Sequence, residues 1–399
     1  MKILVLNCGS SSLKYQLIDM ENEKVMASGK YERIGEKEAF LTHKVKGQKI
    51  KIESPAYNHS EAIDFVLKQL IEPKYKVIDS LDEIDSIGHR IVQGAERFKH
   101  SEIVDENVLN DVAKCGELAP LHNPAAVLGI KACQKAMPKK PNVVVFDTAF
   151  HQTIEKDKFI YPIPYEYYEK YGIRKYGAHG TSHMYVSKRL AQIENKPIED
   201  MKIVTCHLGQ GSSICAIKNG KSVDTSMGLT PTAGVPMVTR SGDLDPSVVT
   251  YIMRKENLSP EEMQNILNNK SGLLGISGLA PDFREIEEEA RLNNNEKAKM
   301  AIECFNYSVA SFIVKYGVAM DGIDYIVFTG GIGENQVTIR EAICKKLEFL
   351  GVKIDEKINN IRGEEMLISK PDSKIKVYVI PTNEELMIAR ETKNLVEKK

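Results

Sequence analysis

Short apolar runs, each ending in polar or glycine-rich residues, recur along the whole chain. Helical patterns separate several of the runs, and this alternation indicates an α/β fold. The six strand-like runs lie at residues 3–6, 87, 143–146, 203–206, 325–328 and 377–380. Ligands of open α/β sheets bind in a crevice beyond strand ends, so these six ends predict one shared site.

Two segments have the apolar spacing of amphipathic helices. Asn58 and Glu61 resemble a capping box in front of the first helix. Its expected apolar face is Ile63, Val66, Leu67, Leu70 and Ile71. The second face is Ile302, Phe305, Val309, Phe312, Ile313 and Tyr316, with an expected helix end near Gly317. Residues 287–291 predict a solvated, charged helix face.

The chain contains a faint internal repeat. Residues 2–13 align with residues 202–214, with one extra residue in the second copy, and both predict strand, Gly/Ser loop, strand. Asn219-Gly220 then predicts a tight hairpin turn. Two similar loops about 200 residues apart imply two similar domains, each presenting a loop to a cleft. Two unrelated hairpins are the alternative.

Length and composition exclude several classes of protein. The 399 residues suggest two to four domains, most simply two. Lys+Arg 54 against Asp+Glu 55 argues against a nucleic-acid binder with a large basic surface. Seven cysteines without CxxC spacing indicate a reducing compartment rather than a disulfide framework or zinc ribbon. No apolar stretch has the length of a signal-peptide core or of a membrane span, so we expect a soluble cytoplasmic protein.

The glycine-rich loops favour phosphate binding. Such loops offer backbone N–H groups without bulky side chains. Neither GxxxxGK[ST] nor a GxGxxG at a strand–helix turn is present, so a nucleotide would be held by a different loop. His179 and His183 have i,i+4 spacing but lack HExxH, which disfavours zinc. His179 would then donate to an anion or serve the structure alone.

Four charged residues follow strand-like or turn-like segments. The planar forks of Arg90 and Arg240 suit carboxylate or phosphate, with surface salt bridges as the alternative. Asp147 and Glu384 lie where strand-end acids are expected. Mg²⁺ is typically bound by one or two protein carboxylates together with phosphate oxygens and waters, so these two acids suit a magnesium site. Capping of a following helix is the alternative for Glu384.

Together these segments resemble the acetate kinase family, within the sugar-kinase, Hsp70 and actin superfamily. The resemblance covers essentially the whole chain and runs in order through eight motifs. They are residues 7–14, 89–94, 119–124, 146–151, 176–183, 239–243, 330–335 and 381–385.

The resemblance implies two actin-like, ribonuclease-H-like domains with mixed sheets flanked by helices around a central cleft. The implied domains are residues 1–149 plus 386–399 and residues 150–385, with dimer contacts in the second. The implied activity is reversible, in-line transfer of the ATP γ-phosphoryl group to acetate, giving acetyl phosphate and ADP. A homodimer that uses Mg²⁺, with Mn²⁺ as a substitute, is also implied, with no nucleic-acid or membrane partner.

The resemblance also assigns roles to individual residues. Asp147, His179, Arg240 and Arg90 are the implied catalytic residues, and Arg90, Val92, Leu121 and Pro231 bind the acyl substrate. Asn7 and Glu384 hold the metal. The implied nucleotide-binding residues are Lys14, His207, Leu208, Gly209, Gln210, Gly211, Asp282, Phe283, Arg284, Gly330, Gly331, Ile332, Gly333 and Glu334. An acetate nucleophile is already ionised near neutral pH, so Asp147 is expected to orient metal or substrate rather than to remove a proton.

Several residues depart from the family pattern, among them Thr232, Ala233 and Pro236. Ala178 replaces a usual Phe in the acyl pocket, which leaves propionate or butyrate as alternative substrates. Gln210 replaces a usual Asn and Val238 a usual Gly. A nucleotide-driven conformational module is the alternative from another class, although paired arginines disfavour it. A diphosphate donor is disfavoured by the intact loop at 330–334.

Overall fold

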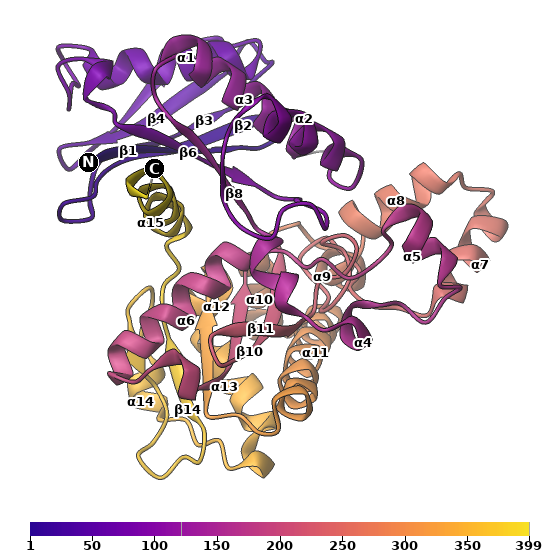
Figure 1. Cartoon of the computed structure of the whole chain (residues 1–399). Coiled ribbons are helices and arrows are strands. Elements are labelled where there is room, and N and C mark those ends of the chain that lie inside the picture. Colours follow the sequence, from indigo (N-terminus) through magenta and orange to yellow (C-terminus); the bar gives the residue numbers. More distant parts are fainter. Residues whose placement is uncertain (121, 399) are drawn as a thin grey trace. The chain divides into compact units, whose positions relative to one another are not determined.

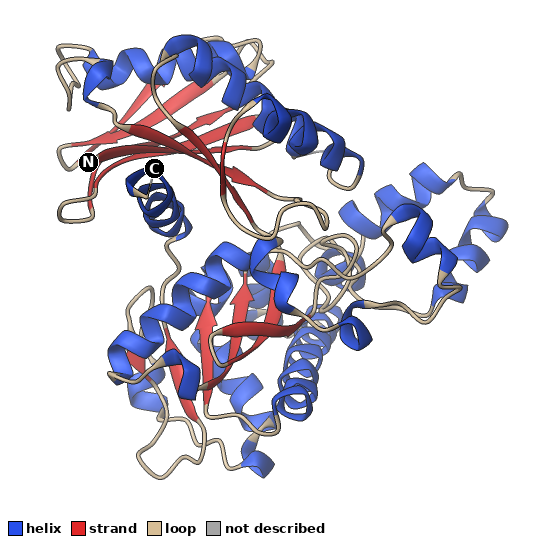
Figure 2. Cartoon of the chain, viewed as in Figure 1, coloured by secondary structure: helices blue, strands red, loops and turns tan. Residues whose placement is uncertain are grey.

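The computed structural model describes residues 1–120 and 122–398. The chain divides into two compact units, Met1–Gln152 with Asn383–Lys399, and Thr153–Thr382. Each unit has its own sheet and its own hydrophobic core (Figures 1 and 2). Both sheets are mixed and flanked by helices, which confirms the predicted α/β class.

The first unit is built on an eight-stranded sheet of order β5-β4-β3-β2-β1-β6-β8-β7. Strands β1, β6 and β8 are parallel to one another, and the other pairings are antiparallel. The strands are β1 (Lys2–Cys8), β2 (Ser12–Asp19), β3 (Lys24–Glu32), β4 (Phe40–Val45), β5 (Gln48–Glu53), β6 (Ser86–Ile91), β7 (Glu102–Ile103) and β8 (Asn142–Phe146).

Helices cover both faces of this sheet. Helices α1 (His59–Ile71) and α3 (Asn123–Ala136) share a core with the face that carries Leu4, Leu6 and Cys8. Helix α15 (Glu384–Glu397) contacts β1, β6 and β8 on the opposite face (Figure 1). The unit also contains α2 (Glu106–Lys114) and the 3₁₀ turns Leu81–Glu83 and Cys115–Glu117, and the turn Ala149–Thr153 spans the boundary between the units.

The start of α1 is confirmed, with one correction. The Asn58 side chain accepts the backbone N–H of Glu61, as predicted. The Glu61 carboxylate accepts from the backbone of Tyr57 and the side chain of Asn58, not from the Asn58 backbone. The cap is therefore reciprocal, but it is not a standard capping box.

The second unit has a six-stranded sheet of order β11-β10-β9-β12-β14-β13. Its strands are β9 (Lys202–Leu208), β10 (Ser212–Lys218), β11 (Lys221–Thr225), β12 (Tyr325–Thr329), β13 (Met366–Leu367) and β14 (Lys376–Val379). Its helices are α4 (Lys156–Phe159), α5 (Glu166–Tyr171), α6 (Gly180–Glu194), α7 (Pro246–Glu256), α8 (Pro260–Asn269), α9 (Gly272–Ser277), α10 (Phe283–Leu292), α11 (Glu296–Met320), α12 (Gly330–Asn335), α13 (Val337–Lys346) and α14 (Glu356–Asn359), with 3₁₀ turns at Ile198–Asp200 and Glu348–Leu350.

The two sheets share one central order, β3-β2-β1-β6-β8 and β11-β10-β9-β12-β14. The predicted repeat is confirmed, because β1 and β9 have the same burial pattern and each forms a hairpin with the next strand. The predicted offset is wrong. Cys8 pairs with Leu13 and Leu208 with Ser212, so the second turn is one residue shorter, not longer. The Asn219-Gly220 turn is confirmed, with both residues at positive φ.

Helix α11 runs three residues beyond its predicted end at Gly317 and is capped by Asp321. A Cβ at Gly317 would lie 3.3 Å from Ile323, so glycine here permits a close contact inside the helix. None of the described helices combines the length and the apolar character that a membrane span requires.

Candidate active site

Strand alternation places several predicted residues of the first unit on one face of its sheet. Asn7 pairs directly with Lys14 across the β1–β2 hairpin. The parallel register aligns Leu6 with His89, so Arg90 follows on the face of Asn7. Asp147 comes two positions after Val145, the neighbour of Arg90 in β8, and so belongs to the same face. This face is the one that α15 covers.

A glycine on β6 lets α15 approach that face. A Cβ at Gly88 would lie 2.5 Å from Thr392 Oγ1 and 2.7 Å from Ile388 Cγ2, both on α15. Glu384 is the first residue of α15, and the Asn383 side chain caps the helix by accepting the N–H of Leu386. Asn383 rather than Glu384 therefore caps the helix.

Arg90 and Asp147 form a buried two-point ion pair. Arg90 Nη2 lies 2.6 Å and Nε 3.1 Å from Asp147 Oδ2, and the Asp147 side chain is fully buried. Burial opposes the charge of Arg90, but the carboxylates of Asp147, Glu384 and Glu385 outweigh it and raise the pKa of the guanidinium. A surface salt bridge is thus excluded for Arg90.

Hydrogen bonds hold the loop after β6, where Val92 lies. The Asn123 side chain accepts from the backbone of Gln93 and donates to its carbonyl. Thr148 Oγ1 accepts the N–H of Gly94, which ties this loop to the residues after Asp147. Leu121, the other predicted acyl contact of this unit, lies outside the described residues.

In the second unit, His179 is the centre of a hydrogen-bonded histidine cluster. Its Nδ1 lies 2.9 Å from Ser213 Oγ, which is also 2.8 Å from Nε2 of the buried His183. His183 Nδ1 lies 2.7 Å from Thr205 Oγ1. The His179 and His207 rings stack with centroids 4.1 Å apart. These bonds orient His179 from the sheet beneath it.

The predicted phosphate loops of this unit lie together. Thr329 aligns with His207 in neighbouring parallel strands, so the residues after them meet at one sheet edge. A Cβ on Gly209 would lie 3.9 Å from the backbone nitrogen of Gly331. The Glu334 carboxylate accepts the N–H groups of Gly330 and Thr382, which joins a third strand end to the two loops.

Arg240 meets His179 next to the first of these loops. A Cβ on Gly211 would lie 3.3 Å from Arg240 Nη1 and 3.4 Å from His179 Cε1, so this glycine leaves room for both side chains. Arg240 Nη1 donates to the Pro231 carbonyl at 3.3 Å, and burial lowers the pKa of the guanidinium. No carboxylate of the described residues forms an ion pair with Arg240. An arginine without a carboxylate partner is suited to an anionic ligand.

Ala178, the first departure from the family pattern, packs against Met227 and Met237. Both methionines are fully buried, and Met237 Sδ lies 3.8 Å from Arg240 Nη1. Ala178 and the two methionines therefore form a small buried apolar cluster beside Arg240. Val238 is also buried in the main core of this unit.

The predicted nucleotide residues at the start of α10 have a mixed environment. Asp282 caps α10 and pairs with Arg284 at 2.9 Å, and both are solvent-accessible. The Phe283 side chain is 4% exposed and packs edge-on against Phe305. Phe283 thus belongs to the core of this unit, and a role in nucleotide binding stays a prediction for all three residues.

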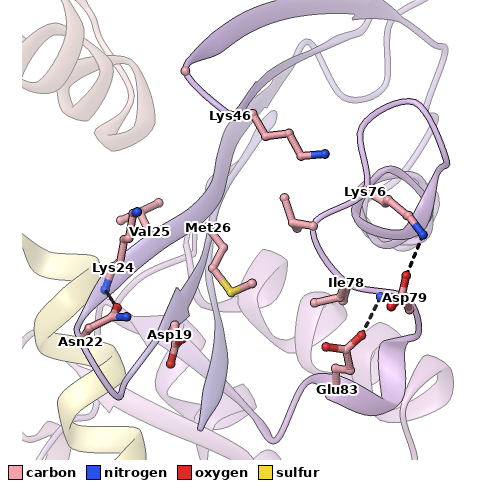
Figure 3. Close-up of a pocket in the computed structure, with 12 residues that line it drawn as sticks. Asp19, Asn22, Lys24, Val25, Met26, Lys46, Lys76, Ile78, Asp79 and Glu83 are labelled. Atoms are coloured by element: carbon pink, nitrogen blue, oxygen red, sulfur yellow. Dashed lines mark hydrogen bonds and ion pairs between the residues drawn. The ribbon is translucent and has the colours of Figure 1, made fainter.

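A pocket of about 780 Å³ opens elsewhere in the first unit. Lys24, Lys46, Lys76 and Asp79 are among the residues around it, and Lys76 is paired with Asp79 (Figure 3). None of the predicted site residues lines this pocket. Volume alone does not identify the site of this chain.

Sequence reasoning missed the residues that support the site. Ser213, Thr205 and Ser182 received no role, although strand alternation in the second hairpin puts Thr205 and Ser213 on the face of His207. Met227 and Met237 had no local signal, because their contact with Ala178 joins distant segments.

Comparisons with known proteins show the family of this chain. The family model described as the acetokinase family matches residues 2–390. The chain belongs to the acetokinase family. A relative named acetate kinase from Thermoanaerobacterium thermosaccharolyticum is 57% identical over 397 residues, which cover 100% of this chain and 99% of the relative. The relative of the same name from Thermotoga maritima is 56% identical over 401 residues, with 100% of this chain and 99% of the relative covered.

Two solved structures also match this chain over almost its full length. The acetate kinase of Porphyromonas gingivalis superimposes with a TM-score of 0.95 at 46% identity over 99% of both chains. A propionate kinase from Francisella tularensis gives a TM-score of 0.92 at 44% identity, also over 99% of both chains. The fold therefore does not separate these two acyl substrates.

Proposed function

We propose that this chain is an ATP:acetate phosphotransferase, which reversibly converts ATP and acetate to ADP and acetyl phosphate. The observation that carries the proposal is full-length identity of 56–57% to several proteins named acetate kinase. An acetate oxygen attacks the γ-phosphorus, the bond from that phosphorus to the β,γ-bridging oxygen breaks, and ADP leaves with the electron pair.

Arg90 binds the acetate carboxylate in this proposal, and Asp147 positions Arg90. The carboxylate nucleophile needs no general base, because it is ionised at neutral pH. The two-point bond from Arg90 to Asp147 supports the positioning role, since it holds the guanidinium in one orientation. Val92, Leu121 and Pro231 then contact the acetate methyl.

His179 and Arg240 stabilise the migrating phosphoryl group. Charge on its equatorial oxygens has to be neutralised while the attacking and leaving oxygens stay in line. Arg240 supports this role because it forms no ion pair with a described carboxylate. Lys14, residues 207–211, residues 282–284 and residues 330–334 hold the nucleotide.

Asn7 and Glu384 would hold Mg²⁺. One amide oxygen and one carboxylate, completed by phosphate oxygens and waters, fit an ion that keeps few protein ligands, and Mn²⁺ would be accepted by the same oxygens. Asn7 lies on the sheet face that α15 covers, and Glu384 is the first residue of α15, which supports a joint role. The ion, when bound, neutralises phosphate charge.

Acetate is the proposed acyl substrate in preference to propionate. Ala178 alone would enlarge the pocket, but its contacts with Met227 and Met237 support a small pocket. The structural similarity to a propionate kinase keeps propionate as the second candidate. We further propose a cytoplasmic homodimer that has no nucleic-acid or membrane partner.

The test is acyl phosphate formation, trapped with hydroxylamine, from ATP, Mg²⁺ and acetate, propionate or butyrate in parallel. We expect acetate to give the highest kcat/KM. Met237→Ala should raise the propionate-to-acetate ratio by up to about 10–100-fold, because one methylene in such a pocket is worth about 1–3 kcal/mol. Val248→Ala, at an exposed position of α7, is the matched control. Acyl phosphate from none of the three acids would refute the proposed function.

A further inference from the structure

The turn between β1 and β2 is held by a side chain from another element. His59, the first residue of α1, has its Nε2 2.7 Å from the carbonyl oxygen of Gly9. Because a ring nitrogen that bonds a carbonyl has to donate, His59 Nε2 carries the proton in this contact. The histidine is 6% exposed, so water competes little for the bond.

The corresponding turn of the second unit is closed in a different way. There the carbonyl oxygen of Gly209 accepts from Ser212 Oγ at 3.1 Å, so the turn bonds to itself. The first turn is one residue longer, because Cys8 pairs with Leu13 and Leu208 with Ser212. A longer Gly/Ser turn has more conformations to lose, and a contact from outside the turn restricts them.

This contact acts from the face opposite to the predicted site residues. Helix α1 packs on the face of the first sheet that carries Cys8, whereas Asn7 and Lys14 belong to the other face. His59 therefore holds the Gly9 carbonyl on the α1 side. Carbonyl and phosphate oxygens both carry negative charge, so this orientation removes a repulsive group from the side of the loop that faces a phosphate.

The loop keeps backbone donors for an anion. The N–H of Gly9 is used inside the turn, where it donates to the Ser12 carbonyl at 2.8 Å. Within the part of the chain that the structure describes, neither the N–H of Ser10 nor that of Ser11 has an acceptor. Both serines are exposed, so these donors are open to a ligand. Adjacent N–H groups on a Gly/Ser turn suit phosphate oxygens.

The cap of α1 fixes the position of the histidine. Asn58 Oδ1 accepts the N–H of Glu61 at 3.0 Å, and Glu61 Oε2 accepts the N–H of Tyr57 at 2.8 Å. These bonds close the first helical turn, in which His59 lies. The loop is thus tied to an ordered helix, which is the kind of support that a precise binding site requires.

We propose that His59 is a positioning residue, which holds the Gly9 carbonyl on the α1 side so that the loop at residues 9–12 directs its N–H groups to the transferred phosphoryl group. The proposal rests on the proposed function, in which the acyl and metal residues belong mostly to this unit and most nucleotide residues to the other. ATP and acetyl phosphate carry the transferred group, and ADP does not. His59 should therefore matter for the first two ligands and little for ADP.

A pair of amide substitutions tests this role. The side-chain nitrogen of Gln matches the reach of His Nε2, whereas that of Asn is too short to reach Gly9. We expect His59→Asn to raise the dissociation constant of a non-hydrolysable ATP analogue with Mg²⁺ by about 10–100-fold in calorimetry, as loss of a supporting contact does. The dissociation constant of ADP should stay nearly unchanged, and His59→Gln should recover most of the analogue affinity. Equal losses for both nucleotides, or equal losses in both variants, would overturn the proposal.

Another buried histidine of the same unit supplies the control. His43 bonds Tyr15 and is fully buried, so His43→Gln removes a buried imidazole that does not contact the loop. We expect it to lower the thermal stability and to leave the affinity for the ATP analogue unchanged. Weaker analogue binding in His43→Gln and His59→Asn alike, in proportion to their lost stability, would make His59 a structural residue only.

The acyl phosphate assay separates this proposal from the proposed function. A wild type that forms acyl phosphate, with the same kcat/KM for ATP and for acetyl phosphate in His59→Asn, refutes the role of His59 and leaves the function standing. A wild type that forms none, but binds the ATP analogue more tightly than His59→Asn does, supports the role of His59 in holding the loop and refutes the function.

Discussion

Arg90 is a largely buried cation whose charge is stabilised by neighbouring carboxylates. Its guanidinium has lost most of its hydration, and the negative charges of Asp147, Glu384 and Glu385 compensate for the lost stabilisation of the cation. The arginine therefore combines a fixed orientation with a permanent charge, which an anion-binding residue requires. Histidines in the same unit show the opposite effect, since burial without a carboxylate favours the neutral form.

Loss of Arg90 should reduce phosphoryl transfer much more than nucleotide binding. We expect Arg90→Gln to lower kcat/KM for acetate by about 10²–10³-fold, as removal of one charge-stabilising donor does, with the KM for ATP changed little. Arg97→Gln, which removes an exposed arginine paired with Asp111 and Glu102, is the matched control. Steady-state kinetics with each substrate varied in turn measure both effects, and a selective rise in the ATP KM would contradict the assignment.

Ser213→Ala should lower kcat for phosphoryl transfer and leave the KM for ATP little changed. Ser213 Oγ lies 2.9 Å from His179 Nδ1, so its loss removes a contact that holds the imidazole ring in place. Ser213→Thr keeps a hydroxyl at this position and should restore kcat. Steady-state kinetics measure both parameters, and an unchanged kcat in Ser213→Ala would show that this contact does not position His179.

His89 should make the first unit less stable at acid pH. The side chain is buried, and burial lowers the pKa of His89 to about 4, partly opposed by its bond to Asn142. The unfolded chain protonates near pH 6.5, so the stabilisation is complete above about 6.5 and is lost as the pH falls towards 4. Its size is about 3 kcal/mol.

Denaturant unfolding at several pH values measures this effect. We expect His89→Gln to flatten the fall in unfolding free energy between about pH 6.5 and pH 4, where the two states differ in protonation. His100→Gln, at an exposed position, should leave the slope as in the wild type. A wild-type slope in His89→Gln would show that other groups dominate the acid response.

At the scale of elements, the two units place their predicted site residues in the same way, near the ends of central strands. A central strand carries a polar residue one position before its end, and a hairpin puts a second polar residue beside it, Lys14 next to Asn7 and Ser213 next to His207. A helix then covers that face of the sheet, α15 in the first unit and α6 in the second. Residues from separate strands meet because the register aligns the strand ends.

Gly88→Ala should disturb the proposed metal site through α15. The new Cβ would lie within 2.7 Å of Ile388 and Thr392, so the helix has to shift, at a cost of about 1–3 kcal/mol. Glu384 moves with the helix, and we expect a higher Mg²⁺ concentration at half-maximal rate. Gly116→Ala, whose Cβ would have only ordinary contacts at 3.7–3.8 Å, is the control. An unchanged Mg²⁺ requirement together with the loss of stability would separate α15 from the metal.

At the scale of the whole molecule, two units of similar topology carry different parts of the proposed chemistry. The acyl and metal residues belong mostly to the first unit, and most nucleotide residues belong to the second. Binding of ADP should therefore slow amide hydrogen exchange in the loops at 207–211 and 330–334. The exchange rates of β3, β4 and β5 should stay unchanged. Protection confined to the first unit would contradict this division.

The sequence by itself determined the local elements and the family. Strand ends, the Asn219-Gly220 turn and the start of α1 follow from side chains within a few residues of each other, and the ordered motifs identify the acetokinase family. Tertiary structure alone decided what surrounds the site residues: the bond of Arg90 to Asp147, the bonds of Ser213 to two histidines, and the methionines behind Ala178. Each joins residues far apart in the chain, and strand register and core packing, which local patterns do not specify, bring them together.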